Sequence, residues 1–163
     1  LKAFDAHLTR QPYLLGHRPA ACDFAVFGQL TQLAEFDPTP MALTLKTAPR
    51  VTAWVGMMED QSGVEPAQDG WNDINALPET LIALLTEIGR VYPPVMLANA
   101  RAVAAGASEV EAVVDGQAWS QQPFPYQAKC LQWLRASRAD LEAGARAKVD
   151  SILAPTGCMA LFA

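Results

Sequence analysis

The side chains best suited to chemistry in this sequence are three cysteines and two histidines. The cysteines lie far apart, at Cys22, Cys130 and Cys158. The histidines, His7 and His17, are ten residues apart on what we expect to be different elements. This pattern has neither CxxC nor Cys/His ligand spacing, so it indicates no metal site and no disulfide framework. We expect both histidines to be surface residues or hydrogen-bonded structural residues.

Cys22 is the one cysteine whose surroundings could activate a thiol. It falls in the first turn of a predicted helix, where the helix dipole stabilises a thiolate. Its element is expected to pack, and no histidine is adjacent, so we expect it to be unreactive. Cys130 and Cys158 are expected to be small buried hydrophobes. The sequence has no GxSxG, P-loop, GxGxxG or HExxH motif, and we assign it no catalytic residue.

The stretch 11–33, QPYLLGHRPAACDFAVFGQLTQL, reads as a loop followed by a helix. The loop closes on Gly16, and Pro19 comes just before the helix. Asp23 falls in the first turn, where a carboxylate accepts backbone N–H bonds near Ala20 and meets the positive end of the helix dipole. We therefore interpret Asp23 as a structural helix cap and not as a catalytic acid.

Helical spacing predicts two apolar helix faces in this half of the chain. The first follows Asp23 and consists of Phe24, Phe27, Leu30 and Leu33. The second follows Pro49, which suits a first-turn position, and consists of Val51, Trp54, Val55 and Met58. Between them, we interpret 36–40 as a turn-rich connection whose two prolines exclude a continuous helix.

The segment PYLLGHRPAACDFAVFGQL resembles the hallmark of the C-terminal, all-helical domain of glutathione transferases, an "fLlG-rPs-aDf" loop that leads into a helix. The resemblance continues through 37–40 and 48–54 and covers about the first 60 residues. Beyond Gln61 the chain resembles, less closely, the C-terminal extension of some bacterial transferase-like proteins.

The expected fold is mainly α, a glutathione-transferase C-terminal-like helical bundle. We divide it into a helical core over 1–60 (incomplete at its start), an acidic loop over 61–77, and a helical extension over 78–163 packed on the same domain. A small β-hairpin is predicted near 109–122, because Asp115–Gly116 between strand-like runs is a two-residue hairpin signal. Helical continuation through Val114 is the competing interpretation.

The second half is otherwise predicted to be helical. A helix begins after Pro78, is kinked or broken at Pro93–Pro94, and ends at Gly106. A last long helix is predicted over about 125–153. Five basic residues make it locally positive: Lys129, Arg135, Arg138, Arg146 and Lys148. We interpret them as a solvated helix face; the alternative is a surface that binds a partner or an anionic ligand.

Composition limits the range of functions. The chain has 163 residues, 51% of them hydrophobic, and a net charge of −5. The negative charge argues against nucleic acid as a partner. No uninterrupted apolar run reaches 18 residues, so we expect no membrane partner, and the cytoplasm as location.

The resemblance implies a division of labour. Glutathione, the co-substrate, would be bound and activated mainly by a thioredoxin-like N-terminal domain. We expect that domain to be missing, since the chain lacks an initiator Met and opens in what reads as the end of a helix. The helical domain would supply the apolar wall of the pocket for a small hydrophobic electrophile and a homodimer surface. This piece alone is expected to be inactive.

Three aromatic residues in exposed-looking positions are our candidates for substrate binding: Tyr13, Trp71 and Trp119. For Trp71 the plainer alternative is that it pins the acidic loop to the core. At the level of function, a non-catalytic transferase-fold interaction or adaptor module is the alternative to an enzyme, because the same scaffold can lose its chemistry.

The chain departs from the family pattern at Ala20, where a serine or threonine usually caps the helix. We predict that Ala20→Ser raises the free energy of unfolding by about 1 kcal/mol, because its hydroxyl can accept a bond from the first turn. Thermal melts of the two proteins check this. An unchanged or lower melting temperature would contradict this interpretation of the helix start.

Overall fold

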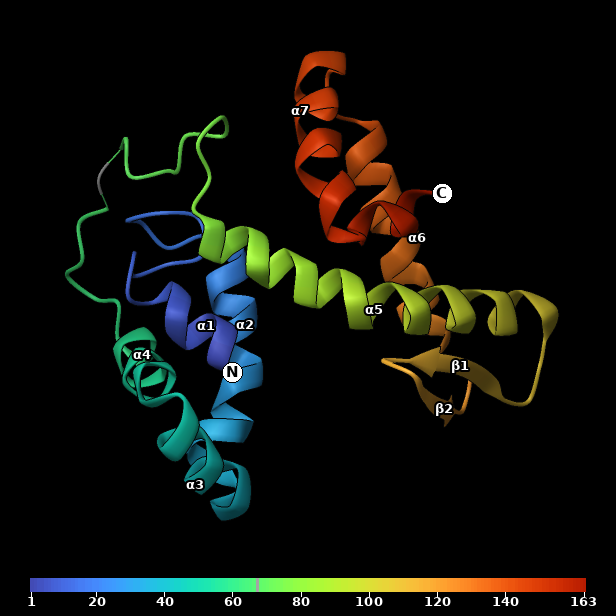
Figure 1. The fold of residues 1–163 in the computed structure, drawn as a ribbon, viewed down its shortest axis with the longest axis horizontal. Helices are drawn as coiled ribbons and strands as arrows, with labels where there is room; N and C mark the ends of the chain where they lie inside the picture. The colour runs from blue at the N-terminus through green and yellow to red at the C-terminus, as the bar shows by residue number, and fades with distance from the viewer. Residues whose placement is uncertain (67) are drawn as a thin grey trace. The chain divides into compact units, whose positions relative to one another are not determined.

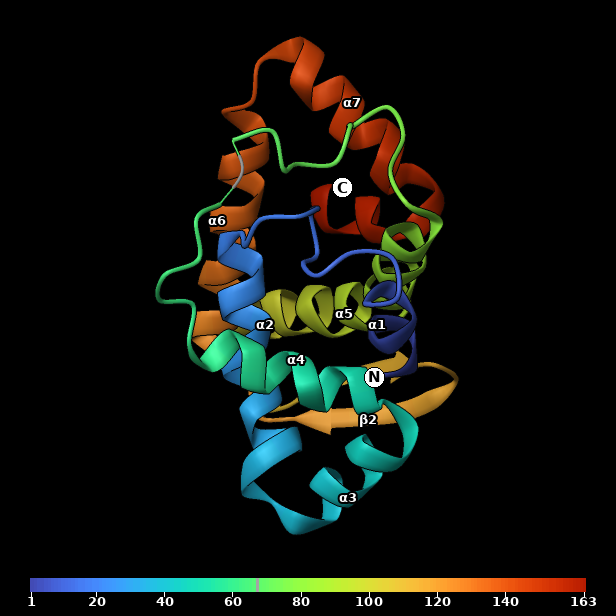
Figure 2. The same cartoon turned by 90° about the vertical axis from the view of Figure 1, so that its left-hand side faces the viewer.

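The computed structural model of the chain describes residues 1–66 and 68–163. The chain divides into two compact units, Leu1–Leu84 and Leu85–Ala163. Figures 1 and 2 show the helices of each. The elements of the first unit are α1 Lys2–His7, α2 Ala21–Thr31, a π-helical turn Gln32–Phe36, α3 Pro38–Thr47, α4 Pro49–Glu59 and the start of α5 Glu79–Ala105. The second unit contains the rest of α5, β1 Val110–Val114, β2 Gln117–Gln121, α6 Pro125–Ala139, α7 Ala143–Leu153 and two 3-10 turns, Ala154–Thr156 and Cys158–Phe162.

The core of the first unit is built on α4. The predicted apolar face is confirmed, since its four residues are all buried: Val51, Trp54, Val55 and Met58. The Trp54 ring meets Phe4 of α1 edge to face at 4.9 Å between centroids. Its indole N–H donates to the Pro12 carbonyl at 2.8 Å. The predicted face of α2 is only partly buried, because Leu30 is covered while Phe24 is 49% exposed.

The chain between α2 and α4 is more helical than predicted. The π-helical turn extends α2 to Phe36, and α3 begins at Pro38. The two prolines do not prevent α3, because they stand in its first turn, where backbone N–H groups have no helical acceptor. The Asp37 carboxylate caps this turn by accepting from the N–H of Thr39 at 2.9 Å.

Gly16 brings two loops of the first unit into backbone contact. The His17 N–H donates to Gly70 O at 2.7 Å, and the Asn72 N–H donates to Leu15 O at 2.8 Å. Gly16 has φ +139°, and a Cβ there would stand 2.2 Å from Gly70 O. The 61–77 loop is therefore tied back at its C-terminal side; it includes position 67, which lies outside the described residues.

The sequence predicts a kink or a break at Pro93–Pro94. In the second unit α5 runs through both prolines as one helix, so a break there is wrong. Pro93 cannot donate to the carbonyl of Gly89, one turn earlier. At this turn the C-terminal segment packs directly on the helix, and a Cβ at Gly89 would stand 1.9 Å from Thr156 O. Packing thus compensates for the lost hydrogen bond, and the 3-10 tail docks with Cys158 and Leu161 buried.

By length and composition alone α5 could cross a membrane, with a mean hydropathy of 1.4 over its most apolar window. The sequence predicts no such helix, because no uninterrupted apolar run reaches 18 residues. Core helices of soluble proteins pass the same test.

The predicted hairpin is confirmed. β1 and β2 pair antiparallel, with Val114 opposite Gln117 and Val110 opposite Gln121. The two turn residues, Asp115 and Gly116, have φ 52° and 75°, as a type I′ turn requires.

The last long helix is two helices, contrary to prediction. The chain leaves helical geometry at Glu142, whose ψ is 150°. Arg138 and Asp150 would be about 18 Å apart along one straight helix. The turn instead lets them form a two-bond ion pair, with Arg138 Nε and Nη2 at 2.7 and 2.6 Å from the carboxylate oxygens. On α6 Leu131 is buried, while Trp133 is 49% exposed.

Gly16 offers a sharp test of the loop contact. We predict that Gly16→Ala lowers the free energy of unfolding by about 3 kcal/mol, because the methyl group meets backbone atoms that cannot swing aside. The matched control is Gly28→Ala in α2, where a Cβ meets nothing within 4 Å. That change should raise stability by up to about 1 kcal/mol. Urea unfolding monitored by circular dichroism measures both, and equal effects would contradict the close contact.

Candidate functional site

The loop between α1 and α2 is organised by buried side chains that take up its backbone groups. The Gln11 amide donates both hydrogens, to the carbonyls of Tyr13 and Leu14, each at 3.0 Å. His7 is fully buried beneath the same loop. Its Nε2 lies 3.2 Å from the Tyr13 carbonyl, and its Nδ1 lies 3.0 Å from the Thr80 hydroxyl.

Both ring nitrogens of His7 have partners in either neutral tautomer. With the hydrogen on Nε2, the ring donates to the Tyr13 carbonyl and accepts at Nδ1 from the Thr80 hydroxyl. With the hydrogen on Nδ1, the ring donates to Thr80 and accepts at Nε2 from the Gln11 amide, 3.2 Å away. Burial lowers the pKa of His7 below its ordinary value of 6.5. The hydrogen bond to Tyr13 and the charge of Asp23 oppose that shift. The imidazole is therefore a neutral structural group, as the sequence predicted.

Asp23 joins this loop to the start of α2. Its side chain has no exposed surface. One carboxylate oxygen accepts from the N–H of Leu14 and the other from the N–H of Ala20, both at 2.8 Å. The predicted bond to Ala20 is present, and the bond to Leu14 is an additional one that links two ends of the loop.

Tyr13 is not the exposed aromatic that the sequence led us to expect. Its ring is 6% exposed and belongs to the core of the first unit. The hydroxyl donates to the Gln61 side chain at 2.9 Å. The loop sequence around Tyr13 gives no sign of this burial, because Gln61, the partner of its hydroxyl, is far away in the chain.

Of the two candidate aromatics in the first unit, Trp71 is the exposed one. Its backbone forms a bridge to Gly16, and its side chain is 47% exposed. The guanidinium carbon of Arg18 lies 4.6 Å from the centre of its ring. The backbone bridge thus ties Trp71 to the first unit, as the plainer interpretation has it, and the ring stays half-exposed. Its role in substrate binding stays a prediction. Gly16 bridges Tyr13 and Trp71, whereas Trp119 belongs to the other unit.

Two surface hollows bear on ligand binding. One, of about 440 Å³, lies on the β1–β2 hairpin and includes Trp119, which is 47% exposed. The other, of about 480 Å³, lies in the first unit and is lined by Arg10, Gln11, Pro78, Glu79 and Thr80. The second hollow adjoins the His7 network through Gln11 and Thr80. No sequence motif marked it, since its lining comes from the loop after α1 and from the start of α5, which are distant in the chain.

The cysteines show no activated thiol among the described residues. Burial raises the pKa of the Cys22 thiol, and the neighbouring charge of Asp23 raises it further. The helix start therefore does not make Cys22 a nucleophile. Among the described residues no cluster of histidine, cysteine and carboxylate side chains could hold a metal ion.

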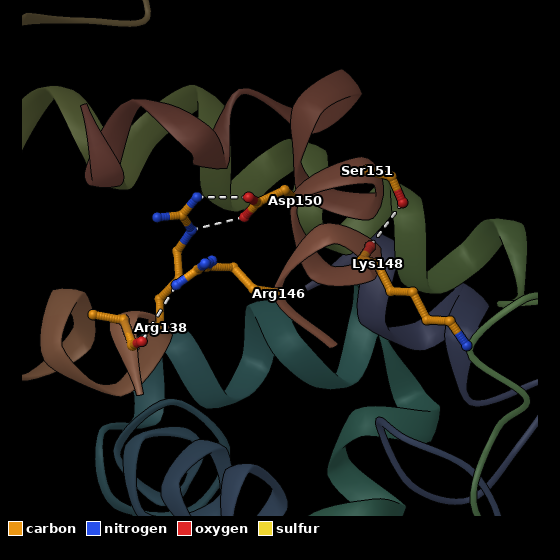
Figure 3. Close-up of polar contacts among 6 residues, drawn as sticks. Arg138, Arg146, Lys148, Asp150 and Ser151 are labelled. Carbon is orange, nitrogen blue, oxygen red and sulfur yellow. Dashed lines mark hydrogen bonds and ion pairs between the residues drawn. The ribbon is translucent and has the colours of Figure 1, made fainter. Parts of the chain in front are cut away.

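Most of the basic residues on α6 and α7 have partners within the chain. Figure 3 shows the Arg138–Asp150 pair, with Arg146 beside it. The guanidinium of Arg138 lowers the pKa of Asp150. Arg135 donates to the carbonyls of Leu161 and Ala163 at 2.6 and 2.9 Å. These contacts favour a structural role for the positive charge over an anion-binding surface.

Helices α1, α2 and α4 surround a buried acid and a glycine-centred loop. Residues 1–62 match the family described as "Glutathione S-transferase, C-terminal domain". This part of the chain is similar to that domain, and residues 63–163 lie outside the match. Searches of curated proteins and of solved structures gave no match.

The buried histidine predicts a pH dependence. Its pKa is lower in the folded than in the unfolded chain, so unfolding takes up a proton once the pH falls below about 6.5. We predict that the free energy of unfolding declines there by up to about 1.4 kcal/mol per pH unit, and levels off below the folded pKa. Urea titrations at pH 7.5 and 5.5 measure this.

His7→Gln should remove this part of the pH dependence, and His17→Gln, at an exposed position, should retain it. An identical pH dependence in the wild type and in His7→Gln would contradict the assignment.

Proposed function

We propose that the chain is the C-terminal part of a glutathione transferase-type protein, whose glutathione is activated by a thioredoxin-like domain outside these 163 residues. The family match over residues 1–62 carries this proposal. It is supported by the bonds of Asp23, which hold the loop and the helix that the motif comprises.

The state of the polar side chains supports the division of labour. Cys22 has a raised pKa, and the Tyr13 hydroxyl is committed to Gln61. Neither group is prepared to lower the pKa of a bound thiol. Thiol activation and most glutathione contacts are therefore assigned to the thioredoxin-like partner domain, in a cytoplasmic homodimer.

Trp71 is our candidate for the electrophile wall in this chain. Backbone hydrogen bonds fix its position on both sides. The His17 N–H donates to the Gly70 carbonyl, and the Asn72 N–H donates to the Leu15 carbonyl. The exposed indole offers a flat apolar surface at low entropic cost. Arg18 over the ring could orient an electronegative substituent. Trp119 remains a candidate for substrate binding only because it lines the hollow on the hairpin. Tyr13 is buried, so its ring does not support the predicted role in substrate binding.

The alternative function, an interaction module without catalysis, is favoured by an aromatic row on α6. Phe124, Tyr126 and Trp133 are 50, 57 and 49% exposed. Tyr126 meets Trp133 edge to face at 6.0 Å between ring centroids. Exposed aromatic rings are typical anchors in protein interfaces.

The test uses the protein joined to its thioredoxin-like domain. We expect it to bind immobilised glutathione and to conjugate a small aromatic electrophile, while the isolated 163-residue chain shows no turnover. Trp71→Ala should raise KM for the electrophile about tenfold with little change in KM for glutathione, because about 1.4 kcal/mol of apolar contact is lost. Steady-state kinetics measure both constants.

Trp133→Ala, an equally exposed tryptophan in the second unit, is the matched control and should leave both constants unchanged. Turnover by the isolated chain would refute the division of labour. Absence of glutathione binding and of any conjugating or reducing activity would favour the interaction module.

A further inference from the structure

The outer edge of β2 carries backbone groups with no strand beside them. In the described part of the chain the sheet has two strands, β1 and β2. Four of the five β2 residues are exposed, whereas Val110 of β1 is fully buried. In Figure 1 β2 is drawn on the far side of β1 from α5. Such an edge is a template for another strand.

The hairpin turn determines which groups point outward. A two-residue I′ turn makes Val114 and Gln117 a hydrogen-bonded pair. Antiparallel pairing alternates, so Trp119, opposite Ala112, also directs its backbone groups toward β1. Ala118 and Ser120 therefore direct their N–H and C=O groups away from the hairpin.

β2 is short, with five residues, but it lacks three other features by which proteins protect an edge. Its sequence is Gln-Ala-Trp-Ser-Gln, with no charge, no proline and no β-bulge in the pairing register. Lysine, proline and bulges are the usual devices that prevent strand addition. The sequence is, in addition, nearly symmetrical about Trp119, with small residues on either side and glutamine at both ends.

The hairpin has a polar contact to α5 near each of its ends. Asp115 in the turn pairs with Arg90 of α5. After β2, the buried side chain of Asn99 donates to the Phe124 carbonyl at 2.9 Å and accepts from its N–H at 2.8 Å. A strand presented in this way loses little freedom when it pairs.

We propose that β2 pairs antiparallel with β2 of a second copy of this chain, about a two-fold axis at Trp119, to form a four-stranded sheet. A two-fold interface needs a self-complementary surface, and the near-symmetrical, uncharged strand provides one. Ala118 lies opposite Ser120 of the second copy. Their outward N–H and C=O groups meet in two hydrogen-bonded pairs, which give four bonds in all.

This register also suits the central tryptophan. Trp119 and its symmetry mate form a non-hydrogen-bonded pair, the kind in which side chains come closest. Aromatic cross-strand pairs are among the favourable ones, and both rings are half-exposed before pairing. After a shift by one residue, the outward groups of Ala118 and Ser120 would stand opposite residues whose N–H and C=O groups point toward their own β1. The hydrogen bonds therefore specify this register.

The experiment is sedimentation of the 163-residue chain over a range of concentrations, with circular dichroism as the check of folding. We expect a monomer–dimer equilibrium in the wild type. Ala118→Pro removes an outward N–H without removing a bond within the hairpin. It should raise the dissociation constant about tenfold or more, since each dimer loses two bonds. Val113→Pro does the same on β1 and should leave the constant unchanged.

Charge placement tests the register itself. Ala118→Glu with Ser120→Glu sets like charges opposite each other and should abolish the dimer. Ala118→Glu with Ser120→Lys sets opposite charges across the axis and should retain it. A monomeric wild type, a dimer that survives the paired glutamates, or equal effects of the two proline variants would each overturn the proposal. None of these measurements involves glutathione, so they stand apart from the test of the proposed function.

Discussion

The first unit depends on one buried carboxylate. Asp23 is fully enclosed, and an enclosed charge is tolerated only when it is hydrogen-bonded. The N–H groups of Leu14 and Ala20 satisfy its two oxygens, and the start of α2 adds the favourable end of the helix dipole. Because the Asp23 carboxylate must keep both bonds, Leu14 and Ala20 are held near it, and the loop between them is restrained. Gly16 stands inside that loop, so the position of Trp71 follows from the same constraint.

Close backbone approach at a glycine recurs in the second unit. Gly89 allows the turn at Thr156 to reach the α5 backbone, as Gly16 allows the approach of Gly70. In both places the partner is main chain and cannot swing aside. The second contact falls at the turn where Pro93 removes a helical hydrogen bond. Tertiary packing, and not helix propensity, therefore keeps α5 continuous where its sequence alone indicates an interruption.

Features encoded by neighbouring residues could be predicted from the sequence. The Asp23 start of α2, the buried face of α4 and the Asp115–Gly116 hairpin each follow from local capping, period or turn chemistry. The remaining features depend on distant partners. Tyr13 is buried in the core of the first unit, with its hydroxyl satisfied by Gln61, and Arg138 and Asp150 pair across the turn after α6. No local pattern encodes such pairs, and the hollow between the loop after α1 and the start of α5 escaped prediction for the same reason.

Three arginines of the second unit have charged or carbonyl partners within it, and this limits the recognition that they can perform. Arg138 is paired with Asp150, Arg90 with Glu87 and Asp115, and Arg135 with the C-terminal carbonyls. An arginine that already has a partner must give up that contact before it can bind an anion, which reduces the gain. The rings of α6 and the backbone edge of β2 have no such cost. The exposed rings and the strand edge are therefore the surfaces on which our two proposals for the second unit rest, whereas its paired charges join its helices.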